Sequence, residues 1–224
     1  MQVQTASQTQ KFPAGAFGLR TPASTRLPVG TQVVLAKGEE LFSEGDDAEF
    51  FYEVVSGAIR SYKLLSDGRR QIDAFHLTGD IFGLEAGREH RFSAEAVGEV
   101  TVIAYRRSRL TTLIQDDAEF RDRIMNATLR SLERAQDHML LLGRKTAQEK
   151  MATFLLDMAD RLSDDHEHFE LPMQRSDIAD HLGLTIETVS RTLTQFARGG
   201  LIELLPASRS IGLCNKLALR GLNA

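Results

Sequence analysis

The fold is decided by residues 175–194, RSDIADHLGLTIETVSRTLT. Three small or turn-forming positions in this stretch occur at the spacing of a helix-turn-helix. Ala179 leaves room for a second helix to cross closely, and Gly183 can adopt the left-handed conformation that ends a helix. Thr185 is a suitable N-cap for the helix that follows. The stretch therefore predicts two helices joined by a sharp turn.

The two predicted helices span residues 175–182 and 185–198. Apolar side chains at helical spacing are expected to face inward and hold the helices together: Ile178, Leu182, Leu184, Ile186, Val189 and Leu193. The outward face of the second helix then carries Glu187, Ser190 and Arg191, because residues three and four apart share a face. Taken alone, Glu187 and Arg191 would form an ordinary surface pair worth about 0.3–0.5 kcal/mol. In a helix-turn-helix, however, this face enters the major groove of DNA.

Each outward side chain has a suitable partner on DNA. Arg191 can donate two hydrogen bonds to guanine, and Glu187 can accept one from the amino group of cytosine. Ser190 is short enough to meet a thymine methyl or bond a base edge. Phosphates repel the carboxylate unless it meets such a donor, so Glu187 disfavours wrong sequences. Nearby hydroxyls and cations are predicted to contact phosphates: Thr185, Thr188, Arg198 and Arg209.

The rest of the C-terminal region predicts a small domain. A helix is expected at 146–162, and strands at 201–205 and 211–214 predict a β-hairpin, the wing of a winged helix. The connector at 164–168 holds histidines and acids that could bind a metal, but a solvated loop is the preferred interpretation. Cys214 falls on the second strand. We expect it to be buried and inert, with a redox role as the alternative.

Residues 30–105 have the pattern of a β domain. Short apolar runs alternate with turn residues, and the runs at 50–55 and 58–62 predict strands around a tight turn. The pair Asp67-Gly68 predicts a hairpin whose two central residues both have positive φ. Many short strands at this spacing predict a barrel or a sandwich.

Residues 117–142 contain neither Gly nor Pro and predict a helix of roughly 39 Å. Two sets of residues seven apart form one stripe along it: Met125, Thr128, Leu132, Ala135, Met139 and Leu142. We expect this stripe to pair with a second copy of the chain, because a small barrel cannot fully cover so long a helix. The alternative is a single helix lying on the β domain. Gly143 is expected to end the helix.

The bulk composition limits the classes of function. The chain has 224 residues, a net charge of −4 and a single cysteine. One cysteine excludes an intrachain disulfide and an all-cysteine metal cluster within one chain. Neither half of the chain is basic, so DNA binding needs a local positive face. No membrane span or signal peptide is evident, so we expect a cytoplasmic protein without membrane contact. No nucleophile–base pair, phosphate loop or metal set has a recognisable spacing, so an enzyme is not expected.

Several stretches resemble the CRP/FNR superfamily of bacterial transcription regulators. They are KGEELFSEGD at 37–46, TGDIFG at 78–83, QDHMLLLGRK at 136–145 and ETVSR at 187–191. The last matches the E-x-x-S-R pattern of the FNR branch. The resemblance covers about residues 30–214 and implies an α+β fold. That fold comprises an N-terminal cyclic-nucleotide-binding-type β-roll (jelly-roll-like), a long dimerisation helix and a C-terminal winged helix-turn-helix.

Composition and pattern together predict a division of the chain into four parts. Residues 1–28 form a flexible N-terminal arm, for which a tethered strand is the alternative. Residues 29–116 form the β-roll, 117–143 the dimerisation helix and 144–224 the DNA-binding domain.

The function implied by the resemblance is that of a DNA-binding activator. A homodimer is expected to bind palindromic sites with TTGA-type half-sites about one helical turn, ~34 Å, apart. Activation implies contact with RNA polymerase, and the hairpin tip at Asp67, Gly68 and Arg69 is a family-type position for it; a simple tight turn is the alternative. The E-x-x-S-R pattern is similar to that of the FixK-like subgroup, activators of microaerobic respiration and nitrogen-fixation genes.

Three departures from the family bear on its effectors. Residues 1–30 contain no cysteine, which excludes the iron–sulfur sensor of FNR. The nucleotide cassette is altered, since GLE at 83–85 and RFS at 91–93 each carry an extra residue. A heme would need a ligand such as His76, which is more simply interpreted as structural. We therefore expect no cofactor and no obligatory effector. The alternative is a ligand-gated regulator that responds to cyclic nucleotide or heme.

Overall fold

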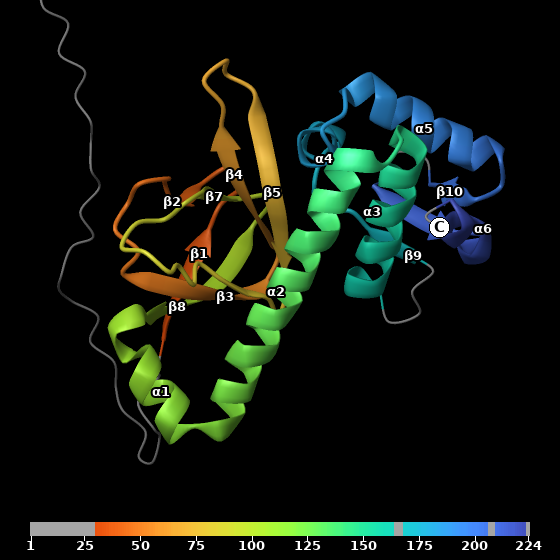
Figure 1. Cartoon of the computed structure of the whole chain (residues 1–224). Coiled ribbons are helices and arrows are strands. Elements are labelled where there is room, and N and C mark those ends of the chain that lie inside the picture. Colours follow the sequence, from red (N-terminus) through yellow and green to blue (C-terminus); the bar gives the residue numbers. More distant parts are fainter. Residues whose placement is uncertain (1–29, 164–167, 206–208, 223–224) are drawn as a thin grey trace, which may run out of the picture.

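The computed structural model describes residues 30–163, 168–205 and 209–222. A β-roll and a C-terminal domain of helices and short strands lie on either side of one long helix (Figure 1). The predicted N-terminal arm, most of the predicted connector loop and the centre of the wing turn lie outside the described residues. Among the described helices, none combines the length and the apolar composition needed to cross a membrane.

The β-roll consists of two four-stranded antiparallel sheets, with strand orders β1-β8-β3-β6 and β2-β7-β4-β5. The strands are β1 (Thr31–Leu35), β2 (Glu40–Phe42), β3 (Phe50–Ser56), β4 (Ala58–Leu64), β5 (Arg70–Leu77), β6 (Ile81–Phe82), β7 (Ser93–Ala96) and β8 (Val100–Arg106). Alternate side chains of both sheets point into a shared core that includes Val54, Ile59 and Val102. The predicted strands on either side of the turn at Gly57 are β3 and β4.

The turn of the β4–β5 hairpin differs from the sequence prediction by one position. The amide of Gly68 donates to the carbonyl of Leu65 at 2.9 Å, so the central residues of the turn are Ser66 and Asp67. Gly68 follows them with a φ of 84°. The prediction of Asp67 and Gly68 as the two central residues was therefore wrong. The loop is one residue longer than the predicted two-residue turn. Its last residue, Gly68, adopts the left-handed conformation, which glycine takes without steric cost.

The long helix is α2 (Ala118–Arg144), preceded by a 3₁₀ turn (Arg107–Arg109) and α1 (Leu110–Asp116). The Asp117 side chain caps α2 by accepting the amide of Phe120 at 3.0 Å. Phe120 and Ile124 bury one side of α2 against Phe51 on the outer face of the β-roll. Gly143 lies inside the helix and Lys145 is the C-cap, so the prediction that Gly143 ends the helix was wrong. Gly143 does not have a positive φ, and the helix ends one residue later, at Arg144.

The C-terminal domain packs four helices around a three-stranded antiparallel sheet of order β10-β11-β9. Its elements are α3 (Ala147–Leu162), β9 (His168–Glu170), α4 (Arg175–Leu182), α5 (Ile186–Arg198), β10 (Ile202–Leu204), β11 (Ser210–Leu213) and α6 (Lys216–Gly221). The predicted wing hairpin is present as β10 and β11. The strand β9 was not predicted, because its three residues follow a polar loop and carry one apolar side chain, Phe169.

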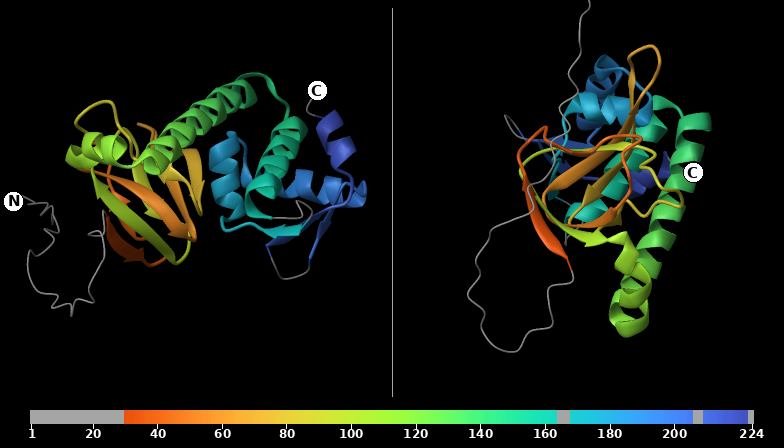
Figure 2. Two further views of the ribbon diagram at one scale, coloured as in Figure 1. Left: turned by 90° about the horizontal axis from the view of Figure 1, so that it is seen from below. Right: turned by 90° about the vertical axis from the view of Figure 1, so that its left-hand side faces the viewer.

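The β-roll and the C-terminal domain share a continuous core. Figure 2 shows β5 facing the C-terminal domain, with α2 running along both. Phe75 of β5 packs edge-on against Phe154 of α3, with 6.3 Å between ring centroids. Leu141, near the end of α2, belongs to the same buried cluster. The position of α4 and α5 is therefore tied to the β-roll.

Candidate DNA-recognition surface

The helix-turn-helix has the local geometry that the sequence predicts. Gly183 adopts the left-handed conformation, with φ 61° and ψ 43°. The amide of Leu184 donates to the carbonyl of Ala179 at 3.0 Å and closes the end of α4. Thr185 caps α5, because its hydroxyl accepts the amide of Thr188 at 3.2 Å. These bonds fix the direction in which α5 leaves the turn.

The buried face of α5 is formed by Val189, Thr192, Leu193 and Phe196. Ile178 and Leu182 of α4 are buried as predicted, and Leu184 is partly buried. Ile186, in contrast, is 48 % exposed, so its predicted inward position was wrong. It shares a stripe with Val189, but it is the first residue of the helix and lies beyond the part of α5 that α4 covers.

The exposed face of α5 presents Glu187 and Arg191 to solvent. In the described part of the chain, neither side chain has a hydrogen-bond or ion-pair partner, so the alternative of a surface pair between them is not what the structure shows. Ser190 is half-buried, and its hydroxyl accepts a hydrogen bond from Nη1 of Arg175 at 3.2 Å. Both charges of this face are therefore available to an external partner.

Arg175 is a site residue that the sequence reasoning missed. It is the first residue of α4, yet its side chain reaches across to Ser190 on α5. The signal in the sequence was a cation in the first turn of a helix, where the helix dipole favours an acid. In the structure, the bond to Ser190 of α5 gives this cation a partner within the chain.

The predicted phosphate-contacting residues surround α5 unevenly. The hydroxyls of Thr185 and Thr188 lie 3.0 Å apart and bond to each other at the start of the helix. Arg198 is exposed in the last turn. Arg209 lies apart from these, at the base of the wing, where it donates to the carbonyl of Pro172 at 2.6 Å. The structure thus brings the two threonines together and leaves the two arginines at separate edges.

The local positive face required by the acidic overall charge is present around α5. Its exposed cations are Arg175, Arg191, Arg198 and Arg209. The acids of α4 point the other way: Asp177 binds arginines of the β-roll and is almost fully buried. Glu187 is the carboxylate that interrupts the positive face.

The predicted stripe on α2 is exposed along its length. Met125, Leu132 and Met139 are 58 %, 55 % and 70 % exposed. Thr128, Ala135 and Leu142 are exposed between them, and the hydroxyl of Thr128 donates to the carbonyl of Ile124 at 2.9 Å. The same helix buries a neighbouring face on the β-roll through Phe120, Ile124 and Ala127, which agrees with the alternative interpretation for that face. The pairing of the exposed stripe with a second copy of the chain stays a prediction. An apolar stripe of this length on a monomer marks an interaction surface.

The interior of the β-roll is filled by stacked rings. Phe42 stacks on His90 and on Tyr52, with centroid distances of 3.6 Å and 5.5 Å. Tyr52 stacks on Phe82 at 5.6 Å. Burial, with a smaller contribution from Asp46, raises the pKa of Tyr52 to about 12, so its phenol stays protonated. These rings occupy the space between the two sheets.

The residues of the altered nucleotide cassette are engaged with each other. A carboxylate oxygen of Glu85 accepts the amide of Arg91 at 3.3 Å, and it lies 3.7 Å from Nδ1 of His90. The guanidinium of Arg107 donates to the carbonyls of Glu85 and Gly87, at 2.6 and 2.9 Å. This segment is therefore held closed by side chains of the chain itself.

His76, the residue considered for heme, is held inside the β-roll. Its Nε2 lies 3.0 Å from the hydroxyl of Ser61, and its ring stacks on Phe82 with centroids 4.3 Å apart. Burial lowers the pKa of His76 to about 4, so the ring is neutral at pH 7. These contacts agree with a structural histidine.

Two further predicted sites lie at the surface. The hairpin tip is exposed, and Arg69 pairs with Asp67 at 2.7 Å within the tip. Cys214 is exposed, so its predicted burial was wrong. The residue lies just past the end of β11, where Ile211 and Leu213 are both buried, and strand alternation no longer applies to it.

Comparisons with known proteins agree with this architecture. The family of Crp-like helix-turn-helix domains matches residues 149–222, and that of cyclic nucleotide-binding domains matches residues 32–117. The nitrogen fixation regulation protein FixK of Azorhizobium caulinodans is 47 % identical over 207 residues, which cover 91 % of this chain and 83 % of that protein. The protein of the same name from Bradyrhizobium diazoefficiens is 45 % identical over 186 residues, covering 82 % and 78 %.

Solved structures give the same result. FixK2 from Bradyrhizobium japonicum matches with a TM-score of 0.81 and 49 % sequence identity, covering 88 % of this chain and 98 % of that chain. The match confirms the predicted α+β fold, and the relatives confirm that the chain is a regulator and not an enzyme. The chain therefore belongs to the CRP/FNR family of DNA-binding transcription regulators, in the group that contains the FixK proteins.

Proposed function

We propose that the chain acts as a homodimer that binds palindromic DNA with TTGA-type half-sites through Glu187, Ser190 and Arg191. The observation that carries this proposal is the pair of unpartnered charges on the exposed face of α5. Arg191 donates to guanine O6 and N7, and Glu187 accepts from the amino group of a cytosine. The hydrogen bond from Arg175 directs the Ser190 hydroxyl towards α4. The Cβ of Ser190 is then free to contact a thymine methyl.

Ile186 extends this base-reading surface. It is exposed beside Glu187 in the first turn of α5, the part of a recognition helix that enters the groove most deeply. Apolar side chains distinguish thymine by contact with its methyl group. The proposed role of Ile186 is therefore contact with a thymine of the half-site.

The remaining exposed polar groups position the helix without specifying sequence. Thr185, Thr188 and Arg198 lie at the two ends of α5, and Arg209 lies at the wing. Phosphates pass on both sides of a helix seated in the major groove, so these residues are proposed to contact the backbone.

Dimerisation is proposed through the exposed stripe of α2: Met125, Thr128, Leu132, Ala135, Met139 and Leu142. Leu129 and Leu140, at 55 % and 63 % exposure, widen the apolar surface beyond the predicted seam. A helix of 27 residues, about 40 Å long, presents enough length for four turns of seam packing. Two copies paired in this way carry two recognition helices, as a palindrome requires.

DNA binding is proposed to need no small effector. Rings fill the β-roll interior, and Arg107 together with Glu85 closes the segment where the family cassette lies. The target genes are proposed from the relatives, which are named nitrogen fixation regulation proteins. An activator must also meet RNA polymerase, and the exposed tip at Asp67, Gly68 and Arg69 is the proposed contact.

Base-by-base competition tests the assignment of the reading residues. Arg191→Ala and Glu187→Ala are compared with the unaltered chain on duplexes in which each half-site position is varied in turn. Each substitution should remove the preference at one base pair, by about 1–3 kcal/mol, and leave the other positions unchanged. Leu217→Ala, at an 80 % exposed residue of α6, is the matched surface control. An unchanged preference in the Arg191 variant would show that another face of α5 reads DNA.

A further inference from the structure

The first helix of the helix-turn-helix is bound to the β-roll by ion pairs on the side away from α5. A single oxygen of Asp177 accepts Nη1 of Arg60 at 3.0 Å and Nη2 of Arg70 at 2.6 Å. Arg70 also binds Asp180, at 2.9 Å from its Nε. Asp177 is 3 % exposed and Arg60 is 14 % exposed, so this pair is screened little by solvent or salt. Arg60 lies on β4 and Arg70 begins β5.

The same carboxylate also organises the start of α4. The second oxygen of Asp177 accepts the amide of Gln174 at 3.2 Å, which satisfies a backbone group that the helix leaves unpaired. The arginines therefore bind the fixed first turn of α4 rather than a mobile side chain. At the other end of α4, Nζ of Lys150 donates to the carbonyl of Leu182 at 3.0 Å. The helix is held at both ends.

A second set of bonds joins the end of α4 to β5. Nε2 of Gln71 donates to the carbonyl of His181 at 3.3 Å, and Nδ1 of His181 lies 3.2 Å from the carbonyl of Ile72. The ring of His181 stacks on that of His138 of α2, with centroids 4.2 Å apart. The orientation of α4 is thus defined against two elements of the N-terminal half.

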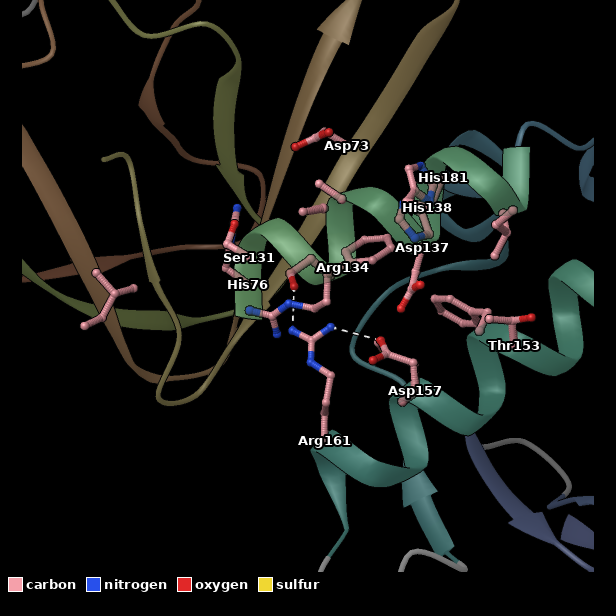
Figure 3. A pocket seen from close by; sticks show the side chains of 17 residues that line it. Asp73, His76, Ser131, Arg134, Asp137, His138, Thr153, Asp157, Arg161 and His181 are labelled. Atoms are coloured by element: carbon pink, nitrogen blue, oxygen red, sulfur yellow. Dashed lines mark hydrogen bonds and ion pairs between the residues drawn. The ribbon is translucent and has the colours of Figure 1, made fainter. Parts of the chain in front are cut away.

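Next to these bonds the packing is incomplete. A cavity of about 170 Å³ lies between β5, α2 and α3, and Figure 3 shows Arg134, His138, Asp157 and Arg161 around it. Side-chain packing alone fixes the orientation of two elements only where the protein interior between them is close-packed. Beside this cavity, directional ion pairs and hydrogen bonds must contribute to fixing α4.

We propose that Arg60 and Arg70 are positioning residues for DNA recognition, which hold α4 and α5 at one angle to the β-roll. This inference rests on the proposed function, because it concerns a dimer that reads two half-sites. In the proposed dimer the two-fold axis runs beside α2, which is packed on the β-roll. The angle between α4 and the β-roll therefore sets the distance between the two recognition helices. That distance sets the number of base pairs between half-sites that the dimer accepts.

The experiment measures affinity as a function of half-site spacing. The full chain and its double variant Arg60→Gln/Arg70→Gln are titrated with duplexes whose spacer is lengthened or shortened one base pair at a time. A duplex with a single half-site is included. The unaltered chain should bind one spacing best. The double variant should lose about tenfold at that spacing and bind the neighbouring spacings nearly as well, because its recognition helices are no longer pre-oriented. Its base preference on the single half-site should remain.

Two further variants keep the result interpretable. Lys63→Gln is the matched control, because Lys63 lies on β4 like Arg60 but pairs with Glu44 of the β-roll and not with α4. This variant should keep the spacing profile of the unaltered chain. Asp180→Asn removes one partner of Arg70 and leaves the buried Asp177 paired. Its spacing profile should lie between those of the unaltered chain and the double variant. This variant tests the inference even if the double variant unfolds.

Two results would overturn the inference. In the first, Asp180→Asn and the double variant, if it is folded, both show the same spacing profile as the unaltered chain. The other is tighter binding, which would mean that these arginines hold α5 away from DNA. If the unaltered chain itself shows no preference for a palindrome, the proposed function fails, and this outcome is visible before any variant is tested.

Discussion

At the scale of single residues, Glu187 decides how the recognition surface is interpreted. A carboxylate within a positive face is unfavourable near phosphates unless a base donor meets it. In the structure it is not neutralised by Arg191, one turn away, although the spacing would allow a pair. The two charges are therefore free to make separate contacts, as the proposed base reading requires.

Ile186 provides a prediction at this scale. Ile186→Ala should lower the preference for one thymine of each half-site by about 1 kcal/mol, because it removes the apolar contact to the methyl group. Replacement of that thymine by uracil, which lacks the methyl, should reduce the effect of the substitution. Competition binding with the two duplexes measures both. Equal losses on thymine and uracil would mean that Ile186 acts only on the stability of α5.

His181 gives a second prediction at this scale, on pH. Burial, together with the neighbouring His138, lowers the pKa of His181 to about 3. The unfolded chain binds a proton near the ordinary pKa of about 6.5, so it binds more protons than the folded chain below that pH. The contribution to stability is therefore complete above pH 6.5 and declines as the pH falls towards 3.

The measurement is urea unfolding at two pH values. Between pH 7 and pH 5, His181 should account for about 1–2 kcal/mol of lost stability. His181→Gln, which does not titrate, should be less stable at pH 7 but should lose less on acidification. A pH dependence identical to that of the unaltered chain would show that His181 is not the titrating group.

At the scale of elements, the helix-turn-helix could be predicted in detail because its constraints are local. Gly183, Thr185 and the apolar positions of α4 and α5 lie within about 20 residues, and the turn has one geometry that satisfies them all. The strand β9 could not be predicted, because three residues acquire their conformation only by pairing with β11. Nor could the ion pair between Arg70 and Asp177, whose partners are 107 residues apart in sequence.

The helix α2 carries the element-scale prediction. Leu132→Glu should weaken the dimer by about 3 kcal/mol or more, because two carboxylates would be buried at facing positions. The variant should sediment as a monomer at concentrations where the unaltered chain is a dimer. Arg130→Glu places the same charge on the opposite side of the heptad and should leave the dimer intact. A dimeric Leu132 variant would place the interface elsewhere on the chain.

At the scale of the whole molecule, the recognition surface and the β-roll differ in how well the sequence describes them. The exposed face of α5 follows from helical periodicity, whereas Arg175 was missed because its contact with Ser190 crosses between helices. The sequence predicts that no effector is obligatory, because the nucleotide cassette is altered. The packing that supports this prediction, the rings of Phe42, Tyr52 and Phe82 in the roll interior, depends on side chains from three strands.

This filled interior leads to a prediction for the intact protein. Adding about 1 mM cyclic AMP should leave the thermal midpoint of the chain unchanged, because the rings occupy the space that the nucleotide would need. A ligand that does bind the folded state, at 100 times its Kd, would add about 2.7 kcal/mol of stability. Differential scanning fluorimetry with and without the nucleotide measures this. A rise of several degrees would reveal a nucleotide site that opens between the rings.

The most direct test of the central claim is a binding titration of the purified full chain, with no nucleotide or heme added. One duplex carries TTGA and TCAA half-sites, and the other has the same composition in scrambled order. We predict that the palindrome binds at least about 1,000-fold more tightly, and that its affinity falls steeply as salt is raised. Equal affinity for both duplexes, or binding that appears only after an additive is supplied, would contradict the account.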